Sequence, residues 1–167
     1  MLRIFGLGAL MLLSGCGQSP TPEEKKRSDA ADVAAVEAIQ QVAPPIKPIT
    51  LQPITLAEIT AKNLSGAGCS FSTTSAAEPL VLALVGRAVI KFADDTVVLV
   101  SDNGGTKLEM GAWEHYVGKE YTLTLKRVPG AGQPVGGEST RYAGELTVRD
   151  AWDRVIYSAQ GPLECGS

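Results

Sequence analysis

The segment YTLTLKR (residues 121–127) decides the fold class, because apolar and polar side chains alternate along it. Successive side chains of a β-strand point to opposite faces of the sheet, so the alternation predicts a strand with one buried and one solvated face. The same alternation returns in RYAGELTVR (residues 141–149). Half-buried strands of this kind are typical of antiparallel sheets.

Seven segments have the composition of strands and are separated by turn residues. They are 69–73, 80–85, 87–93, 96–102, 121–128, 141–149 and 155–159. Residues 80–85 and 97–100 are apolar at every position, as expected for strands that are covered on both sides or belong to a closed barrel core. The connection at 129–137 is long and rich in glycine, which favours a mobile loop. The sequence therefore predicts a mainly β fold, a small antiparallel barrel or sandwich.

Two capping motifs predict helices before the strands. Thr55 and Glu58 have the spacing of a capping box and predict one short helix at the start of the β domain. Thr21 and Glu24 form a similar box around a proline and predict a helix from about residue 22 to 42. Apolar residues recur at every third position of this helix and drift around it, so we expect a solvated spacer. A docking or self-association helix is the alternative.

Prolines at positions 44, 45, 48 and 53 follow the spacer helix. Four prolines within ten residues favour an extended polyproline conformation, which has a rise of roughly 3.1 Å per residue. We therefore divide the chain into three parts. A signal segment spans residues 1–15, a tether of spacer helix and Pro-rich linker (43–53) spans 16–53, and the β domain spans 54–167.

The first residues have the pattern of an export segment. Arg3 precedes an apolar stretch at 4–13 that is too short to span a bilayer and has the length of a signal-peptide core. It ends in LSGC (13–16), which resembles the lipobox of bacterial lipoproteins at all four positions. The resemblance implies cleavage before Cys16, lipidation of that cysteine, and attachment to a membrane facing the periplasm. Gly17 stands where lipoproteins of the inner membrane usually carry Asp, which favours the outer membrane.

Cys69 and Cys165 remain once Cys16 is assigned to the lipid. Paired thiols persist as disulfides in an oxidising compartment, so we expect these two to be bonded. A redox pair or a metal site is the alternative. The sequence argues against it, because it has no Cys-x-x-Cys motif and only one histidine.

Four short stretches carry a second resemblance. They are GAGCSF (66–71), GAW (111–113), ELTVRD (145–150) and CG (165–166). They are similar to a family of Gram-negative lipoproteins of unknown function, over about 110 residues of the chain. The resemblance implies the same order of lipobox, proline-rich linker and one disulfide-bearing domain, and it implies no activity.

Composition and motifs argue against several classes of function. A formal net charge of −3 and 5% aromatic residues provide no basic patch for nucleic acid. The motifs of serine hydrolases, phosphate-binding loops, zinc proteases and calcium loops are missing. We therefore expect no cofactor, no metal and no catalytic residue. Asp94 with Asp95, and Asp150 with Asp153, fall at predicted turns, where Asp usually bonds the local backbone.

Trp113, His115 and Tyr116 are the candidates for a partner surface. They lie between Gly111 and the strand that begins at Tyr121, so we expect their side chains at one end of the barrel, where ligands commonly bind. The glycine-rich loop is a further candidate, and core packing of Trp113 is the alternative. The sequence thus predicts a non-enzymatic module that binds an envelope protein, a glycan or a small ligand.

Two other functions stay open. C-type lysozyme inhibitors are small, disulfide-bearing β-barrel lipoproteins that use a Ser-Gly-x-x-Tyr loop, and the chain is similar to them in size. Here the segment STRY (139–142) keeps the Ser and Tyr at a different spacing and without the Gly. The other alternative is a small envelope hydrolase that uses His115, with carboxylates brought to it by the fold.

Overall fold

The computed structural model describes residues 20–40, 42–75 and 78–167, so the lipidation site predicted at Cys16 lies outside the described residues. Backbone contacts divide the chain into two units, Met1–Pro44 and Pro45–Ser167. In the first, α1 (Pro22–Gln40) is exposed along its whole length, as expected for a solvated spacer. Thr21 and Glu24 cap it reciprocally, which confirms the predicted box. No helix within the described ranges is long and apolar enough to cross a membrane.

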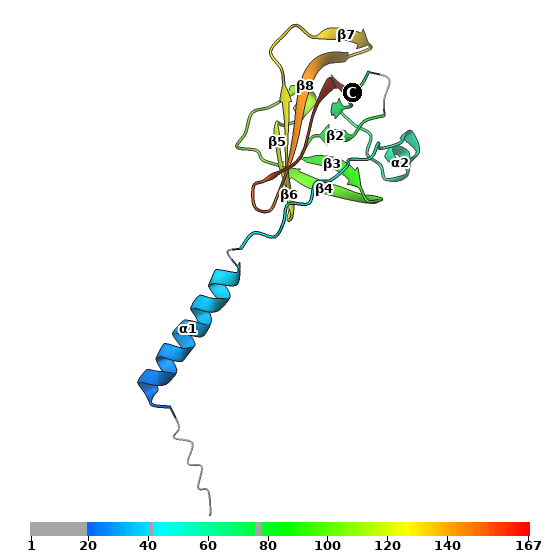
Figure 1. Ribbon diagram of the computed structural model, residues 1–167. Coiled ribbons are helices and arrows are strands. Elements are labelled where there is room, and N and C mark those ends of the chain that lie inside the picture. The colour runs from blue at the N-terminus through cyan, green and yellow to red at the C-terminus, as the bar shows by residue number, and fades with distance from the viewer. Residues whose placement is uncertain (1–19, 41, 76–77) are drawn as a thin grey trace, which may run out of the picture. The chain divides into compact units, whose positions relative to one another are not determined.

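The second unit is built on a closed, eight-stranded antiparallel barrel (Figure 1). Its strands are β1 (Gly68–Phe71), β2 (Val81–Leu84), β3 (Arg87–Phe92), β4 (Asp95–Ser101), β5 (His115–Val117), β6 (Tyr121–Arg127), β8 (Ser139–Asp150) and β9 (Val155–Gly166). Each strand pairs with the next along the chain, except that β6 pairs with β8, and β9 closes the ring against β1. β7 (Gln133–Gly136) is an additional strand that pairs with the first residues of β8. The mainly β fold is confirmed, in its barrel form.

Apolar side chains fill the barrel interior. Leu123 and Leu125, the inward residues of the segment that decided the fold class, are completely buried, as are Leu99 on β4 and Leu163 on β9. A barrel of eight strands is just wide enough for its own side chains to fill. The side chains of the main core therefore occupy the centre of this barrel.

A second apolar cluster covers the outside of β2. Leu82 and Leu84 point outward there and pack with Ile54 and Leu64, which lie on either side of α2 (Leu56–Ala61) (Figure 1). Thr55 and Glu58 cap α2 as predicted. β2 is thus covered on both faces, which explains its uninterrupted apolar sequence.

Residues 97–100 fit the other alternative, because β4 is a strand of the closed barrel and is covered on one face only. Val98 and Val100 on β4 are 53% and 64% exposed, so the outer face of this strand is bare. Leu99 points inward between them and is fully buried. A run of apolar residues indicates that at least one face of a strand is buried. Whether the other face is covered depends on where the helix packs, and α2 lies over β2 and β3.

The folded domain begins earlier than the predicted boundary at residue 54, because the second unit starts at Pro45. Leu51 is buried in the main core, and the Ile49 amide donates to the Ile156 carbonyl. The Gln52 amide donates to the Lys91 carbonyl. Residues 49–52 of the predicted Pro-rich linker (43–53) are therefore an extended strap on the barrel, whereas residues 43–48 are exposed.

The connection predicted as a mobile loop contains a strand. Within residues 129–137, β7 pairs with β8, and Gly136 and Gly137 adopt positive φ angles of 119° and 55° at the turn. Glycine reaches such angles at little cost, so these residues serve a tight hairpin rather than flexibility. β5 was not predicted, and β9 runs beyond the predicted end at residue 159.

Candidate functional site

Tyr116 belongs to the core, so its prediction as part of a partner surface is wrong. It is fully buried, while its neighbours His115 and Val117 on β5 are exposed. Its hydroxyl donates to the Leu84 carbonyl oxygen at 3.3 Å and accepts from the Trp113 amide at 2.9 Å. Burial raises the pKa of the Tyr116 phenol. The phenol therefore keeps the proton that it donates to the Leu84 carbonyl. Successive side chains of a strand point to opposite faces, so Tyr116 points into the barrel because His115 points outward.

Trp113 is half-buried and packs against the main core. The Lys107 ammonium lies 5.0 Å from the centre of its ring, in the geometry of a cation–π contact. Lys107 and Trp113 also form an isolated backbone bridge. Trp113 is therefore a packing residue with one accessible side, which agrees with the alternative of core packing.

His115 lies on the outer face of the barrel and lines a hollow of about 260 Å³. We call it the His115 hollow. The side chains that line it come from three neighbouring strands: His115 from β5, Thr124 and Lys126 from β6, and Glu145, Thr147 and Arg149 from β8. The His115 Nε2 atom lies 3.3 Å from the Thr124 hydroxyl oxygen. The sequence prediction found His115 but not the strand partners that surround it.

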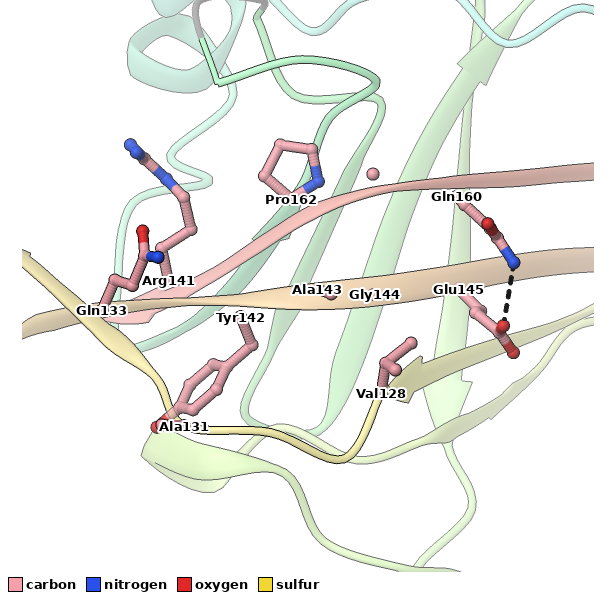
Figure 2. Close-up of a pocket in the computed structure, with 11 residues that line it drawn as sticks. Val128, Ala131, Gln133, Arg141, Tyr142, Ala143, Gly144, Glu145, Gln160 and Pro162 are labelled. Atoms are coloured by element: carbon pink, nitrogen blue, oxygen red, sulfur yellow. Dashed lines mark hydrogen bonds between the residues drawn. The ribbon is translucent and has the colours of Figure 1, made fainter.

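A larger hollow of about 520 Å³ lies over β8 and β9 beside the connection from β6 to β7 (Figure 2). We call it the Arg141 hollow. Its base consists of residues with small side chains or none, Ala143, Gly144 and Gly161. In Figure 2, Arg141 and Gln133 lie at one end, and Glu145 lies at the other end. The sequence analysis did not predict this hollow, because it depends on the pairing of two strands.

Arg141 is held at the edge of this hollow by Glu164, its direct neighbour across β8 and β9. One guanidinium nitrogen, Nη2, lies 3.0 Å from Glu164 Oε2. The Nε atom of the same group is buried and has no hydrogen-bond partner within the described ranges. A buried donor without a partner is costly, so this part of the Arg141 side chain is not stabilised by hydrogen bonding.

Glu145 joins the two hollows, because its side chain lines both. Its Oε1 atom accepts a hydrogen bond of 3.0 Å from Gln160 Nε2 on β9, drawn as a dashed line in Figure 2. The two hollows are therefore adjacent on the outer face of β5, β6, β8 and β9.

The hydrolase alternative requires a carboxylate that orients the His115 imidazole. The structure does bring Glu145 into the same hollow as His115. The side-chain contacts are different, however: the imidazole contacts the Thr124 hydroxyl, and the Glu145 carboxylate accepts from Gln160. Among the described residues, the side-chain neighbour that His115 contacts is thus a hydroxyl, whereas a catalytic triad would place a carboxylate beside the imidazole.

Cys69 and Cys165 form a disulfide, as the sequence predicted. The Glu109 carboxylate lies beside them, and the three side chains are a group that could hold a metal ion by distance alone. Thiolate is the metal ligand of cysteine, and both sulfurs here are bonded to each other. The oxidised protein therefore has no thiolate to offer at this position.

Asp94, Asp150 and Asp153 lie in or beside turns as predicted, whereas Asp95 is the first residue of β4. Asp150 Oδ1 accepts from the amides of Trp152 and Arg154, and Oδ2 accepts from the Arg154 guanidinium at 2.7 Å. The Arg154 side chain holds the pKa of Asp150 below its ordinary value. Asp94 and Asp153 adopt positive φ angles of 65° and 58°, as turn residues do.

The segment similar to the lysozyme-inhibitor motif lies in a strand. Ser139 and Tyr142 belong to β8, which pairs here with β9 along one edge and with β7 along the other. The Tyr142 ring stacks against the Arg127 guanidinium, 5.0 Å from its centre. These residues are thus not in the protruding loop that the resemblance implies.

The chain matches no protein-family model, and comparisons with curated proteins and with solved structures found no match.

Proposed function

We propose that this protein is lipid-anchored in the bacterial envelope and that its barrel binds another envelope component through the outer face of β8 and β9. The component is a protein, a glycan or a small ligand, and the domain acts as a binding module rather than an enzyme. The Arg141 hollow is the observation on which this proposal rests.

The shape of the Arg141 hollow supports the proposal. Its volume of about 520 Å³ falls within the range of roughly 300–1,000 Å³ that ligand sites occupy. Its base is strand backbone in a closed barrel, so a ligand would meet a surface that is already formed. Binding to a preformed surface avoids the entropy cost of ordering loops.

The chemistry of the lining also supports binding. Val128, Ala131 and Pro162 offer apolar contact, whereas Gln133 and Arg141 offer hydrogen-bond donors. Mixed apolar and polar groups of this kind orient a ligand while burying part of its surface. The lipobox at residues 13–16 supports the anchor, and the proposed partner is then a molecule at the same membrane.

In-cell photo-crosslinking tests this function. A photo-reactive phenylalanine analogue replaces Ala143 at the base of the hollow, and a matched protein carries it at exposed Lys119, which is not among the residues that line either hollow. We expect a light-dependent adduct from position 143 and none from position 119. Lack of an adduct at 143, or the same adduct from both positions, would contradict the proposal.

A further inference from the structure

We propose that the His115 hollow binds a tetrahedral oxyanion, a phosphate or sulfate group carried by the envelope partner. This inference rests on the proposed function, since it names the chemical group recognised on the same face of the barrel. It goes further in assigning a second subsite, next to the Arg141 hollow and joined to it by Glu145.

Three hydrogen-bonding side chains form a row across the hollow. In the strand register His115 faces Thr124, and Thr124 faces Thr147. Directly opposed residues have Cβ atoms about 4.5 to 5.5 Å apart, so one small ligand can contact neighbouring members of the row. The Thr147 hydroxyl has no side-chain partner within the described part of the chain, and the Thr124 hydroxyl contacts His115. These groups can donate to different oxygens of a single anion.

A cation lies on each side of this row. Lys126 follows Thr124 by two residues on β6, and Arg149 follows Thr147 by two residues on β8. Because β6 and β8 are antiparallel, the two cations lie on opposite sides of the row. Both side chains line the hollow. Positive charge thus lies on both sides of the row of His115, Thr124 and Thr147.

The Lys126 charge is not neutralised by its strand neighbour. Lys126 faces Glu145 in the register, yet it makes no ion pair among the residues that the structure describes. Glu145 instead accepts from Gln160 on β9 (Figure 2). The ammonium group keeps its three donors for solvent or a ligand.

Arg149 is fixed in place by the turn that follows its strand. Its Nη1 atom donates to the Asp153 carbonyl at 2.7 Å, and its Nε atom lies 3.7 Å from the Asp153 carboxylate. These contacts use part of the guanidinium, which carries five N–H donors. The remaining donors are held at the edge of the hollow before any ligand arrives, which lowers the entropy cost of binding.

The donor set selects the class of ligand. Hydroxyls, an imidazole, an ammonium and a guanidinium all donate to anionic oxygen, and charge-assisted bonds of this kind are about twice as strong as neutral ones. Lys126, Arg149 and Glu145 line the hollow, and the Asp153 carboxylate lies 3.7 Å from the Arg149 Nε atom. The two cations are therefore matched by two carboxylates, and the selectivity for an anion comes from the converging donors rather than from an excess of positive charge. Donors converging from three strands suit the several oxygens of a tetrahedral group.

Titration with inorganic phosphate tests the proposal on the intact lipidated protein in detergent. His115 is the only histidine in the sequence, so its imidazole gives a single NMR reporter inside the hollow. At constant pH we expect a saturable shift of this signal with phosphate or sulfate, and no such shift with chloride at equal ionic strength. A shift with chloride alone, or none with phosphate, would overturn the proposal.

Matched variants separate the site from general electrostatics. Lys126→Glu and Lys119→Glu change the net charge equally, and Lys119 does not line the hollow. We expect Lys126→Glu to weaken phosphate binding by about tenfold or more, and Lys119→Glu to bind like the wild type. Thr147→Val keeps the side-chain shape on an exposed strand face and should also weaken binding. Equal losses from both lysine variants would overturn the proposal.

Two phosphate esters identify the source of the group. Glucose 6-phosphate is compared with glucose, and dihexanoyl phosphatidic acid with dihexanoyl phosphatidylcholine. A response to the sugar ester indicates a glycan, and a response to the phosphatidic acid indicates a lipid headgroup. If neither ester shifts the His115 signal, the proposed oxyanion site is overturned. The proposed function is decided separately, by the crosslinking from position 143.

Discussion

Cys69 and Cys165 stand directly opposite each other in the pairing of β1 with β9, and their sulfur atoms are bonded at 2.02 Å. The bond joins the first strand to the last, at the position where the ring of strands closes. It thereby ties together residues separated by 96 positions in the sequence.

Removing this bond with Cys69→Ala and Cys165→Ala should destabilise the barrel. The entropy of closing so long a loop in the unfolded chain corresponds to about 4 to 5 kcal/mol. We expect a melting temperature lower by several degrees, measured by circular dichroism, and an intact mass of the wild type that rises by two hydrogens on reduction. Free alkylation of both thiols in protein taken from the periplasm would contradict the disulfide.

Tyr116→Phe should lower stability and leave binding intact. The change removes a donor to the Leu84 carbonyl and leaves the Trp113 amide without its acceptor. An unsatisfied buried group costs about 1 to 3 kcal/mol, which chemical denaturation can measure. Unchanged stability together with lost partner capture would show that Tyr116 acts at the surface after all.

Trp113→Ala should lower the stability of the fold, whereas His115→Ala should lower phosphate binding. Trp113 packs on the core but is only half-buried, so we expect a loss of about 1 to 3 kcal/mol, below the roughly 3 to 5 kcal/mol of a fully buried aromatic residue. His115 is exposed, so its variant should melt like the wild type and respond less to phosphate. Thermal melts and isothermal titration calorimetry with phosphate check this on both proteins, because His115→Ala lacks the NMR reporter. A large loss of stability in His115→Ala would contradict its placement on the outer face.

Glu58→Gln should change how stability depends on pH. The Lys91 ammonium, 2.6 Å away, and the Thr55 cap lower the pKa of Glu58 from 4.5 to about 2. Because the folded-state pKa lies below the unfolded value, the carboxylate stabilises the fold fully above pH 4.5, and this contribution is lost as the pH falls toward about 2. The wild type should therefore melt higher than Glu58→Gln near neutral pH, and the difference should shrink across that window. A difference that is constant with pH would contradict the ion pair.

Cys16→Ser should release the protein from membranes. The reason is the lipobox at residues 13–16, which predicts the lipid on this cysteine. Radioactive fatty acid should label the wild type and not the variant, and fractionation should find the variant in the soluble fraction. An unlabelled wild type would contradict the predicted anchor.

Local sequence patterns were sufficient to predict much of the fold. The alternation in residues 121–127 predicted which side chains enter the barrel, and both capping boxes form as predicted. These features depend on neighbours within a few residues, so the sequence contains them directly. Tyr116 and the strap at Leu51 were placed wrongly, because their burial depends on residues far away in the chain.

The sequence by itself determined the strand-forming segments, the helix caps, the lipobox pattern and the two cysteines available for pairing. Tertiary structure alone decided that the strands close into a barrel, that α2 covers β2 while β4 stays bare, and that His115 meets Lys126 and Thr147 in one hollow. The physical reason is that a strand specifies two faces through its period of two, whereas its neighbours are set by long-range hydrogen bonding and burial. The proposed binding surface draws on four strands, so its residues come together only after those strands have paired.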